Sequence, residues 1–210
     1  AMARALQQKK SNIIGLVLPY ITYVFFSELT DAVEECCHEH GYKLMLCKSG
    51  EHQEREQEMF SILQANKVDG ILVCSRFGEA DFFKNCEFPV VSMEREIEGI
   101  TSIMADDYAG GCLAARELLA TGSIHPLIIG SEVPEYLPGT DRIRGFLQEC
   151  EKAGVQAELC LISNTLMGKK VLEHTFFEYV KKHPEVDGIF CTGDMLATQL
   201  FTGLDLRKAE

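Results

Sequence analysis

Hydrophobic and polar positions alternate along this chain in blocks that fit short strands and helices. Ile13–Leu18 is an apolar run with β-branched members, closed by a proline, which is typical of a buried strand. A loop rich in aromatic residues is expected over residues 19–26. From 29 to 37, apolar residues recur at three-and-four spacing, which predicts one face of a helix. Gly41 ends that helix, because glycine readily takes the left-handed cap conformation.

The same alternation continues to the end of the chain. Further strands are predicted at residues 42–47, 68–74, 88–93, 101–105, 125–130, 157–162 and 186–191. Further helices are predicted at residues 51–66, 77–87, 106–122, 142–154 and 168–182, and from Met195 onward. Asp106 or Asp107 is expected to cap the helix that ends at Gly122. Strands that alternate with helices predict parallel, doubly wound sheets.

The chain also repeats itself. The segment Val-Asp-Gly-Ile at residues 68–71 recurs at residues 186–189. In both halves a glycine, Gly41 or Gly154, is followed six residues later by a cysteine that closes a short strand. Each match alone is common in α/β proteins, but two matches in the same order predict two similar lobes.

We therefore expect an α/β protein with an N-terminal lobe at residues 12–122 and a C-terminal lobe at residues 123–210. Two lobes make a cleft at their interface, which is where small ligands prefer to bind. In doubly wound sheets the ligand lies at the carboxyl ends of the strands. Tyr20, Phe25 and Phe26 follow the first strand directly, so we expect them to face that cleft.

Composition narrows the class of protein. The formal net charge of −12 argues against a broad nucleic-acid footprint on these residues, since phosphate binding needs a basic face. No run of 18 apolar residues occurs, so we expect no membrane partner. The nine cysteines are odd in number and form no Cys-x-x-Cys pair, which favours reduced, buried thiols in a cytoplasmic protein. Cys36 and His40 share a helix face as a possible zinc pair, but no second ligand pair is evident.

Catalytic motifs are missing from the sequence. It contains no Gly-x-Ser-x-Gly elbow, no phosphate-binding glycine-rich loop and no His-Glu-x-x-His. The pair Gly110 and Gly111 has no partner glycines. We therefore expect a binding protein rather than an enzyme, with no cofactor and no metal. The alternative that stays open is a carbohydrate-active enzyme with Glu94 and Asp194 as its acid–base pair.

Polar and aromatic residues at predicted strand ends are the candidates for ligand binding. Carboxylates and guanidinium groups can fork to vicinal hydroxyls, and aromatic rings can stack on the apolar face of a sugar or on a planar base. The candidate ligand-binding residues are Phe25, Phe26, Glu94, Arg95, Arg142 and Asp194.

Each candidate also has a purely structural interpretation. Asp194 can be a plain helix cap, and Arg142 can form a surface salt bridge to Asp141 or Glu149. The acid and arginine that follow the fourth strand can be an exposed ion pair, and the two phenylalanines can belong to the core.

From Ala3 to Leu200 the chain closely resembles the effector-binding core of the lactose/galactose/purine (LacI/GalR) repressor family. The most specific motif lies within residues 3–17, where Ala-Arg-Ala-Leu, Lys-Lys-Ser and Ile-Gly-Leu-Val resemble a hinge helix running into the first core strand. Further matching segments are Lys67–Ile71, Val90–Arg95, Asp106–Gly111, Arg142–Phe146 and Thr192–Ala197.

The resemblance implies a periplasmic-binding-protein-like fold, with residues 1–11 as a remnant of the hinge. The family's effector contacts fall on the same six candidate residues. The loop before Arg142 carries Tyr136 and Pro138 but no second arginine, which favours a small carbohydrate or sugar derivative over a purine as effector.

The resemblance also implies a repressor that dimerises and binds operator DNA through a helix-turn-helix headpiece preceding Ala3. In that family the chain then returns to complete the sheets of both lobes, but the residues beyond Leu200 do not resemble the returning segment. We therefore expect the C-terminal part of the fold to be missing here. The alternative is a sugar-binding receptor of an ABC transporter. Nine free cysteines and the hinge-like residues 3–6 argue against it.

Overall fold

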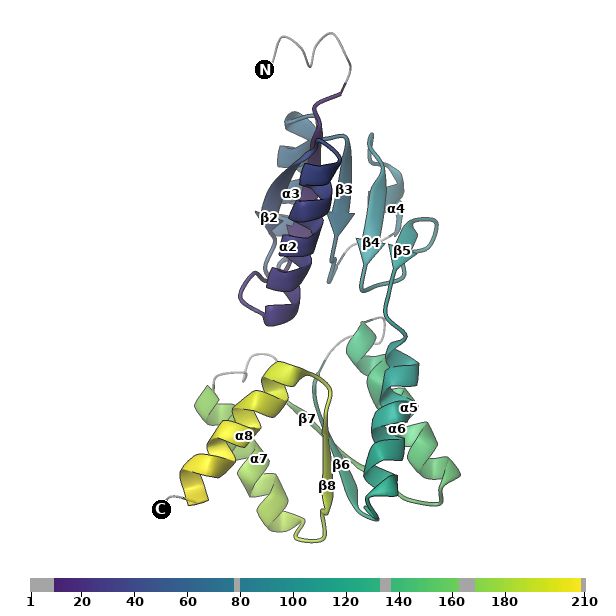
Figure 1. Ribbon diagram of the computed structural model, residues 1–210, viewed down its shortest axis with the longest axis vertical. Helices are drawn as coiled ribbons and strands as arrows, with labels where there is room; N and C mark the ends of the chain where they lie inside the picture. The colour runs from purple at the N-terminus through teal and green to yellow at the C-terminus, as the bar shows by residue number, and fades with distance from the viewer. Residues whose placement is uncertain (1–9, 78–79, 133–136, 163–168, 209–210) are drawn as a thin grey trace. The chain divides into compact units, whose positions relative to one another are not determined.

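The computed structural model describes residues 10–77, 80–132, 137–162 and 169–208. The chain divides into two compact units, residues 1–105 and residues 106–210. Each unit is a parallel sheet with helices on both faces (Figure 1). Within the described ranges, no helix is both long and apolar enough to cross a bilayer.

The first unit contains a five-stranded parallel sheet. Its strands are β1 (Ile13–Leu18), β2 (Lys43–Lys48), β3 (Gly70–Val73), β4 (Val90–Met93) and β5 (Thr101–Ile103). Its helices are α2 (Val24–Glu39), α3 (Gln53–Ala65) and α4 (Ala80–Lys84). The strand order β2-β1-β3-β4-β5 is that of a doubly wound sheet, as the sequence predicts.

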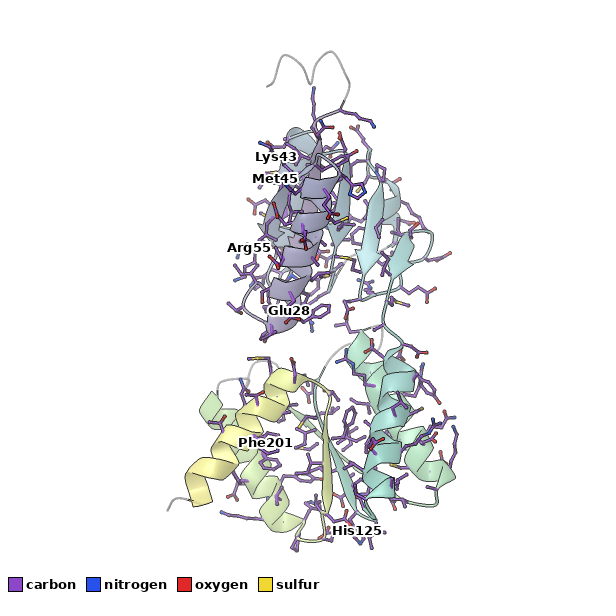
Figure 2. All side chains as sticks on the ribbon, in the orientation of Figure 1. Glu28, Lys43, Met45, Arg55, His125 and Phe201 are labelled. Carbon is purple, nitrogen blue, oxygen red and sulfur yellow. The ribbon has the colours of Figure 1, made fainter. Side chains whose placement is uncertain are left out.

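Alternate residues of β1 face opposite layers, because successive strand side chains point to opposite faces. Leu16 and Leu18 pack in the cluster that contains Leu29 of α2, whereas Val17 packs in the cluster with Phe60 of α3. The outer faces of these two helices are polar, as the exposed Glu28 on α2 illustrates (Figure 2).

The second unit contains a three-stranded parallel sheet in the order β7-β6-β8. Its strands are β6 (Pro126–Ser131), β7 (Glu158–Ile162) and β8 (Gly188–Cys191). Its helices are α5 (Asp107–Ala120), α6 (Pro138–Lys152), α7 (Lys169–Lys182) and α8 (Asp194–Lys208). Ile128 of β6 packs with α5 and α6, while Leu127 and Ile129 pack with α7 and α8 on the other face (Figure 1).

The repeat found in the sequence has a structural meaning. Asp69, before β3, accepts a hydrogen bond from the hydroxyl of Ser11 (3.2 Å), and Asp187, before β8, accepts one from the hydroxyl of Ser123 (2.6 Å). Each carboxylate also accepts backbone N–H groups from the same segment. In both units an aspartate that precedes one strand therefore holds the entry to the neighbouring strand, β1 or β6, so the two lobes are alike, as predicted.

The division between the units differs from the predicted lobe boundary after residue 122. α5 lies in the second unit, because Ala115 packs with Ile128 of β6 and Phe146 of α6. Gly122 ends a helix in the structure, but the chain passes into the second unit before that helix begins. Most of the expected hinge remnant, residues 1–9, lies outside the described residues.

Candidate ligand-binding site

Aromatic side chains gather where β1 ends. Tyr20 follows the strand, and Phe25 and Phe26 lie in the first turn of α2 rather than in a loop, because this helix begins earlier than expected. The rings of Phe25 and Phe26 meet edge to face with centroids 5.1 Å apart, and the ring of Tyr20 lies 6.2 Å from that of Phe26. Phe26 packs against the core residues Leu16 and Leu18, whereas Phe25 is 44% exposed. The ring of Phe25 is therefore the one exposed to a ligand, and the ring of Phe26 packs behind it.

One hydrogen bond and one ion pair join side chains from three strand ends of the first sheet. The Tyr20 hydroxyl donates to Oε1 of Glu51, which follows β2. Nε of Arg76, which follows β3, lies 3.9 Å from the same oxygen. Burial and this hydrogen bond raise the pKa of Tyr20 above its usual value, so Tyr20 stays a donor. Sequence reasoning missed Glu51 and Arg76, although each comes shortly after a predicted strand.

Glu94 and Arg95 form a sharp turn after β4. Glu94 has a left-handed backbone, with φ of 66°, which is uncommon for a residue other than glycine. The Ser92 hydroxyl donates to the carbonyl of Arg95 (2.7 Å) and closes the turn. Nη1 of Arg95 donates to the carbonyl of Phe77 (2.8 Å), so its guanidinium is held near the end of β3. Both side chains are half-buried, and strained turns of this kind are frequent at functional sites.

A buried carboxyl lies behind this edge. Glu56 of α3 is 2% exposed, and its Oε1 accepts a hydrogen bond from the Ser75 hydroxyl (2.6 Å). Burial raises the pKa of Glu56 to about 7, although the Ser75 hydrogen bond and the charge of Arg95 lower it. Sequence reasoning missed Glu56, because an acid in the first turn of a helix usually faces solvent.

In the second unit, Arg142 is fixed by two contacts. Its Nε donates to the carboxylate of Asp107, the first residue of α5. Its Nη1 donates to the carbonyl of Thr192, which follows β8 (2.7 Å). The guanidinium therefore lies at the carboxyl edge of this sheet with about a third of the side chain exposed.

The alternative interpretation of Arg142, a surface salt bridge to Asp141 or Glu149, is wrong, because Arg142 pairs with Asp107. Asp141 pairs with Arg144 at 2.8 Å, and Glu149 pairs with Arg116 at 2.6 Å. The pair of Arg144 and Asp141 is a local i,i+3 contact within α6. The pair of Arg116 and Glu149 joins α5 to α6, so it could not be chosen from the sequence.

Asp194 is the first residue of α8, and its side chain accepts a hydrogen bond from the backbone nitrogen of Met195 (2.8 Å). The expected capping role is therefore present, and the side chain is also exposed. Because Arg142 bonds to the carbonyl of Thr192, two residues before Asp194, both candidates of this unit lie at one sheet edge. Tyr136, which also precedes Arg142, lies outside the described residues.

The candidate zinc pair is a local helix contact. Sγ of Cys36 lies 3.9 Å from Nδ1 of His40, and that nitrogen lies 2.8 Å from the carbonyl oxygen of Cys36. In the described residues, the pair is not part of a group of three or more side chains able to hold a metal ion.

Two doubly wound lobes, each with polar side chains at the carboxyl edge of its sheet, are the architecture of two-lobed proteins that bind small molecules. Residues 11–207 match the family described as periplasmic binding proteins and sugar binding domain of LacI family. The chain belongs to this family, as the resemblance predicted.

Named relatives give a finer comparison. The chain is 30% identical to the sucrose operon repressor of Streptococcus mutans over 93% of its length, and 29% identical to the ribose operon repressor of Bacillus subtilis over 93%. It spans about three fifths of the length of these relatives, 60% and 59%. Both relatives are named as operon repressors.

A solved structure agrees with this comparison. It is a periplasmic binding protein/LacI transcriptional regulator from Alkaliphilus metalliredigens, complexed with D-xylulofuranose. It superposes with a TM-score of 0.82 at 29% identity, covering 95% of this chain and 74% of that one. The predicted periplasmic-binding-protein-like fold is confirmed.

Proposed function

We propose that this chain is the effector-binding core of a bacterial DNA-binding transcriptional repressor. The family match across residues 11–207 carries the proposal. The effector is a small carbohydrate or sugar derivative, in keeping with relatives named for the sucrose and ribose operons and with the sugar-bound regulator.

The effector contacts come from the carboxyl edges of both sheets. Phe25 stacks on the apolar face of the sugar, with Phe26 behind it. Glu94 and Arg95 from the first sheet, with Arg142 and Asp194 from the second, bind sugar hydroxyls. The fixed position of Arg142 supports this assignment, because a guanidinium already held by Asp107 and Thr192 loses little freedom on binding.

Operator DNA is bound by a headpiece outside these 210 residues, and the regulator acts in the cytoplasm as a homodimer. The net charge of −12 is unsuited to DNA binding by the core. All nine cysteines are free thiols, and most are buried, which fits a reducing compartment. Dimerisation follows from the two-fold symmetry of the operators that such repressors read.

A thermal-shift screen of the purified chain against sugars, sugar phosphates and nucleobases tests the effector class. A ligand that binds only the folded state raises the unfolding temperature in a concentration-dependent way. A sugar or sugar derivative should give the largest shift. A shift from nucleobases alone would contradict the carbohydrate assignment.

The screen also tests the site. Arg142→Lys keeps the positive charge but loses the paired N–H donors of the guanidinium. Most of the rise in unfolding temperature given by the best sugar should therefore be lost. Arg144→Lys, on an arginine of the same helix whose side chain is 66% exposed, is the matched control and should keep the shift. Equal shifts in both variants would remove Arg142 from the site.

A mobility-shift assay tests the assignment of DNA binding. The chain alone should not bind operator DNA, whereas the same core fused to a family headpiece should bind it and respond to the sugar. Specific binding by the chain alone would contradict the proposal.

A further inference from the structure

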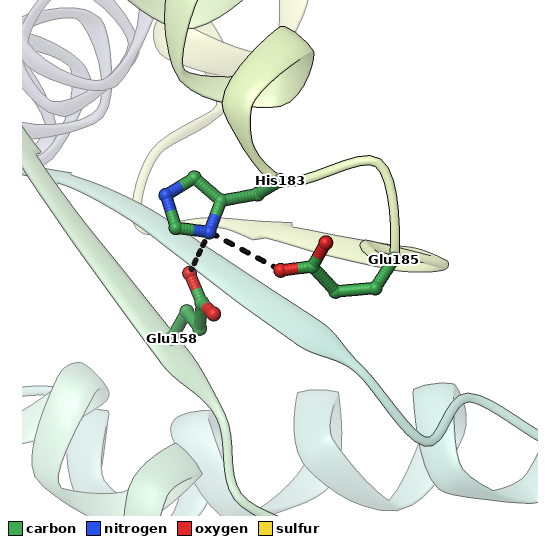
Figure 3. A group of neighbouring side chains, drawn as sticks. All are labelled: Glu158, His183 and Glu185. Carbon is green, nitrogen blue, oxygen red and sulfur yellow. Dashed lines mark hydrogen bonds and ion pairs between the residues drawn. The ribbon is translucent and has the colours of Figure 1, made fainter.

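Three side chains with metal-binding groups converge in the second unit, at the opposite end of its sheet from Arg142. Glu158 begins β7, His183 directly follows α7, and Glu185 lies in the turn that leads to β8 (Figure 3). Nδ1 of His183 lies 3.0 Å from Oε2 of Glu158 and 3.3 Å from Oε1 of Glu185. One ligand atom from each side chain falls within 4.8 Å of the others, and no other such group occurs in the described part of the chain.

These distances suit a shared metal ion. Tetrahedral ligands placed about 2.0–2.2 Å from zinc lie about 3.3–3.6 Å from one another, so the two observed distances need only a small expansion. One imidazole and two carboxylates are ligands that Zn²⁺ accepts. The two negative charges also match a divalent cation.

Neighbouring groups hold the ligands in place. The Tyr179 hydroxyl donates to Oε2 of Glu158 (2.5 Å), and the Tyr179 ring stacks on the His183 ring with centroids 4.3 Å apart. Such supporting contacts orient ligands at known metal sites. The backbone nitrogen of Val186 donates to the carbonyl of His183 (3.2 Å), which fixes the turn that carries Glu185.

The end of α7 adds partial negative charge at this site, and Lys181 and Lys182 lie in the same last turn. His183 lies at the carboxyl end of α7, where the helix dipole is negative. Lys181, in the last turn of that helix, pairs with Glu178 at 3.0 Å, so its ammonium group is drawn to a partner outside the three ligands.

Two carboxylates share one imidazole nitrogen in this cluster. Both carboxylate oxygens approach the same ring nitrogen, as the two dashed lines in Figure 3 show. Nδ1 carries a single hydrogen, which can be directed at only one of the two oxygens. The Tyr179 hydroxyl also donates to Glu158, and a metal ion bound by all three side chains would bring both carboxylates onto one cation.

We propose that Glu158, His183 and Glu185 form a binding site for a divalent metal ion of the zinc class. The ion would tie β7, the end of α7 and the entry to β8 together. It would thereby stabilise the second unit from the end of the sheet that lies away from the candidate ligand-binding site.

Titration calorimetry and thermal unfolding test this site. The purified chain is reduced, freed of metal with a chelator, passed into metal-free buffer and titrated with zinc sulfate. The wild type should bind one zinc ion at this site, and zinc should raise its unfolding temperature. His183→Ala and Glu185→Gln should each lower the zinc affinity by about tenfold or more.

Control variants separate this site from other zinc ligands. His40→Ala removes the imidazole beside Cys36, and His52→Ala removes a surface imidazole in the first unit. Both should keep the wild-type affinity and the thermal shift. Glu185→Gln preserves side-chain size at an exposed position, so its circular dichroism spectrum should show a native fold. This variant therefore tests the site even if His183→Ala unfolds. Absence of zinc binding would overturn the proposal, as would binding that survives in Glu185→Gln or disappears in His40→Ala.

Discussion

A Cβ atom on Gly111 would lie 2.0 Å from the carbonyl oxygen of Arg142, which is much closer than any side chain allows. The relationship is reciprocal, since a Cβ atom on Gly145 would lie 2.1 Å from the carbonyl oxygen of Tyr108. Helices α5 and α6 therefore pack backbone against backbone. This contact brings the helix that carries Arg142 next to the start of α5, where Asp107 binds its guanidinium.

Gly111→Ala should therefore separate the two helices and destabilise the second unit. Forcing a methyl group into a tightly packed contact costs about 1–3 kcal/mol, and here the obstacle is backbone that cannot rotate away. Gly110→Ala is the matched control, because nothing lies within 4 Å of its Cβ position. The control should be neutral or more stable, since alanine favours helix. Urea denaturation measures both, and equal losses would contradict this account of the contact.

The glycine pair at residues 110 and 111 is plain in the sequence, but its role in helix packing is not. Gly110 and Gly111 lack the further glycines that a phosphate-binding loop needs, so the sequence assigns them no role. The partner, Gly145, lies on another helix, and no local pattern says which helix faces will meet. For the same reason the sequence predicts a lobe boundary after residue 122, whereas α5 packs on α6 and belongs to the second unit.

The raised pKa of Glu56 predicts a loss of stability as the pH rises. Its carboxyl has a pKa of about 7 in the folded chain and 4.5 in the unfolded chain, so the folded state holds the proton more tightly. The resulting stabilisation is fully present below pH 4.5 and is lost as the pH rises through about 7. The difference is about 3 kcal/mol, at 1.36 kcal/mol for each pKa unit. Denaturant unfolding between pH 4.5 and pH 8 should show this fall.

Glu56→Gln isolates the contribution, because the amide keeps the shape of the side chain and never ionises. The variant should match the wild type near pH 4.5 and exceed its stability at pH 8. Glu58→Gln, on the exposed face of the same helix, should follow the wild-type profile. Parallel profiles for wild type and Glu56→Gln would show that Glu56 does not carry the pH dependence.

Asp69 should be a major support of the first unit. Its carboxylate accepts hydrogen bonds from the backbone nitrogens of Ser11 and Asn12, both at 2.9 Å, and from the Ser11 hydroxyl. Asp69→Ala leaves these donors without this acceptor, at a cost of about 1–3 kcal/mol. Asp31→Ala, at an exposed position on α2, should cost far less. The comparison is made by urea denaturation, and equal stability of the two variants would exclude this role.

The order of strands and helices could be predicted because apolar periodicity and glycine caps are local signals. Strand ends led to Arg142 and Asp194, which share one sheet edge in the structure. The start of α2 could not be predicted, since Tyr23 at its N-cap makes no side-chain cap hydrogen bond and so leaves no capping signal. Glu51 was missed because its contact with Tyr20 depends on which strand ends lie side by side.

Cys36 should be the fast-reacting thiol of the native chain. It is exposed, whereas burial raises the pKa of the Cys74 thiol to about 12 and that of Cys191 to about 11. Since the thiolate is the reactive form, both burial and the raised pKa slow these groups. A disulfide reagent at pH 8 should modify one thiol rapidly, and all nine in denaturant. Cys36→Ser should abolish the rapid phase, while Cys86→Ser, at a half-buried thiol, should leave it intact. A rapid phase that persists in Cys36→Ser would mean that a second thiol is reached in the folded state.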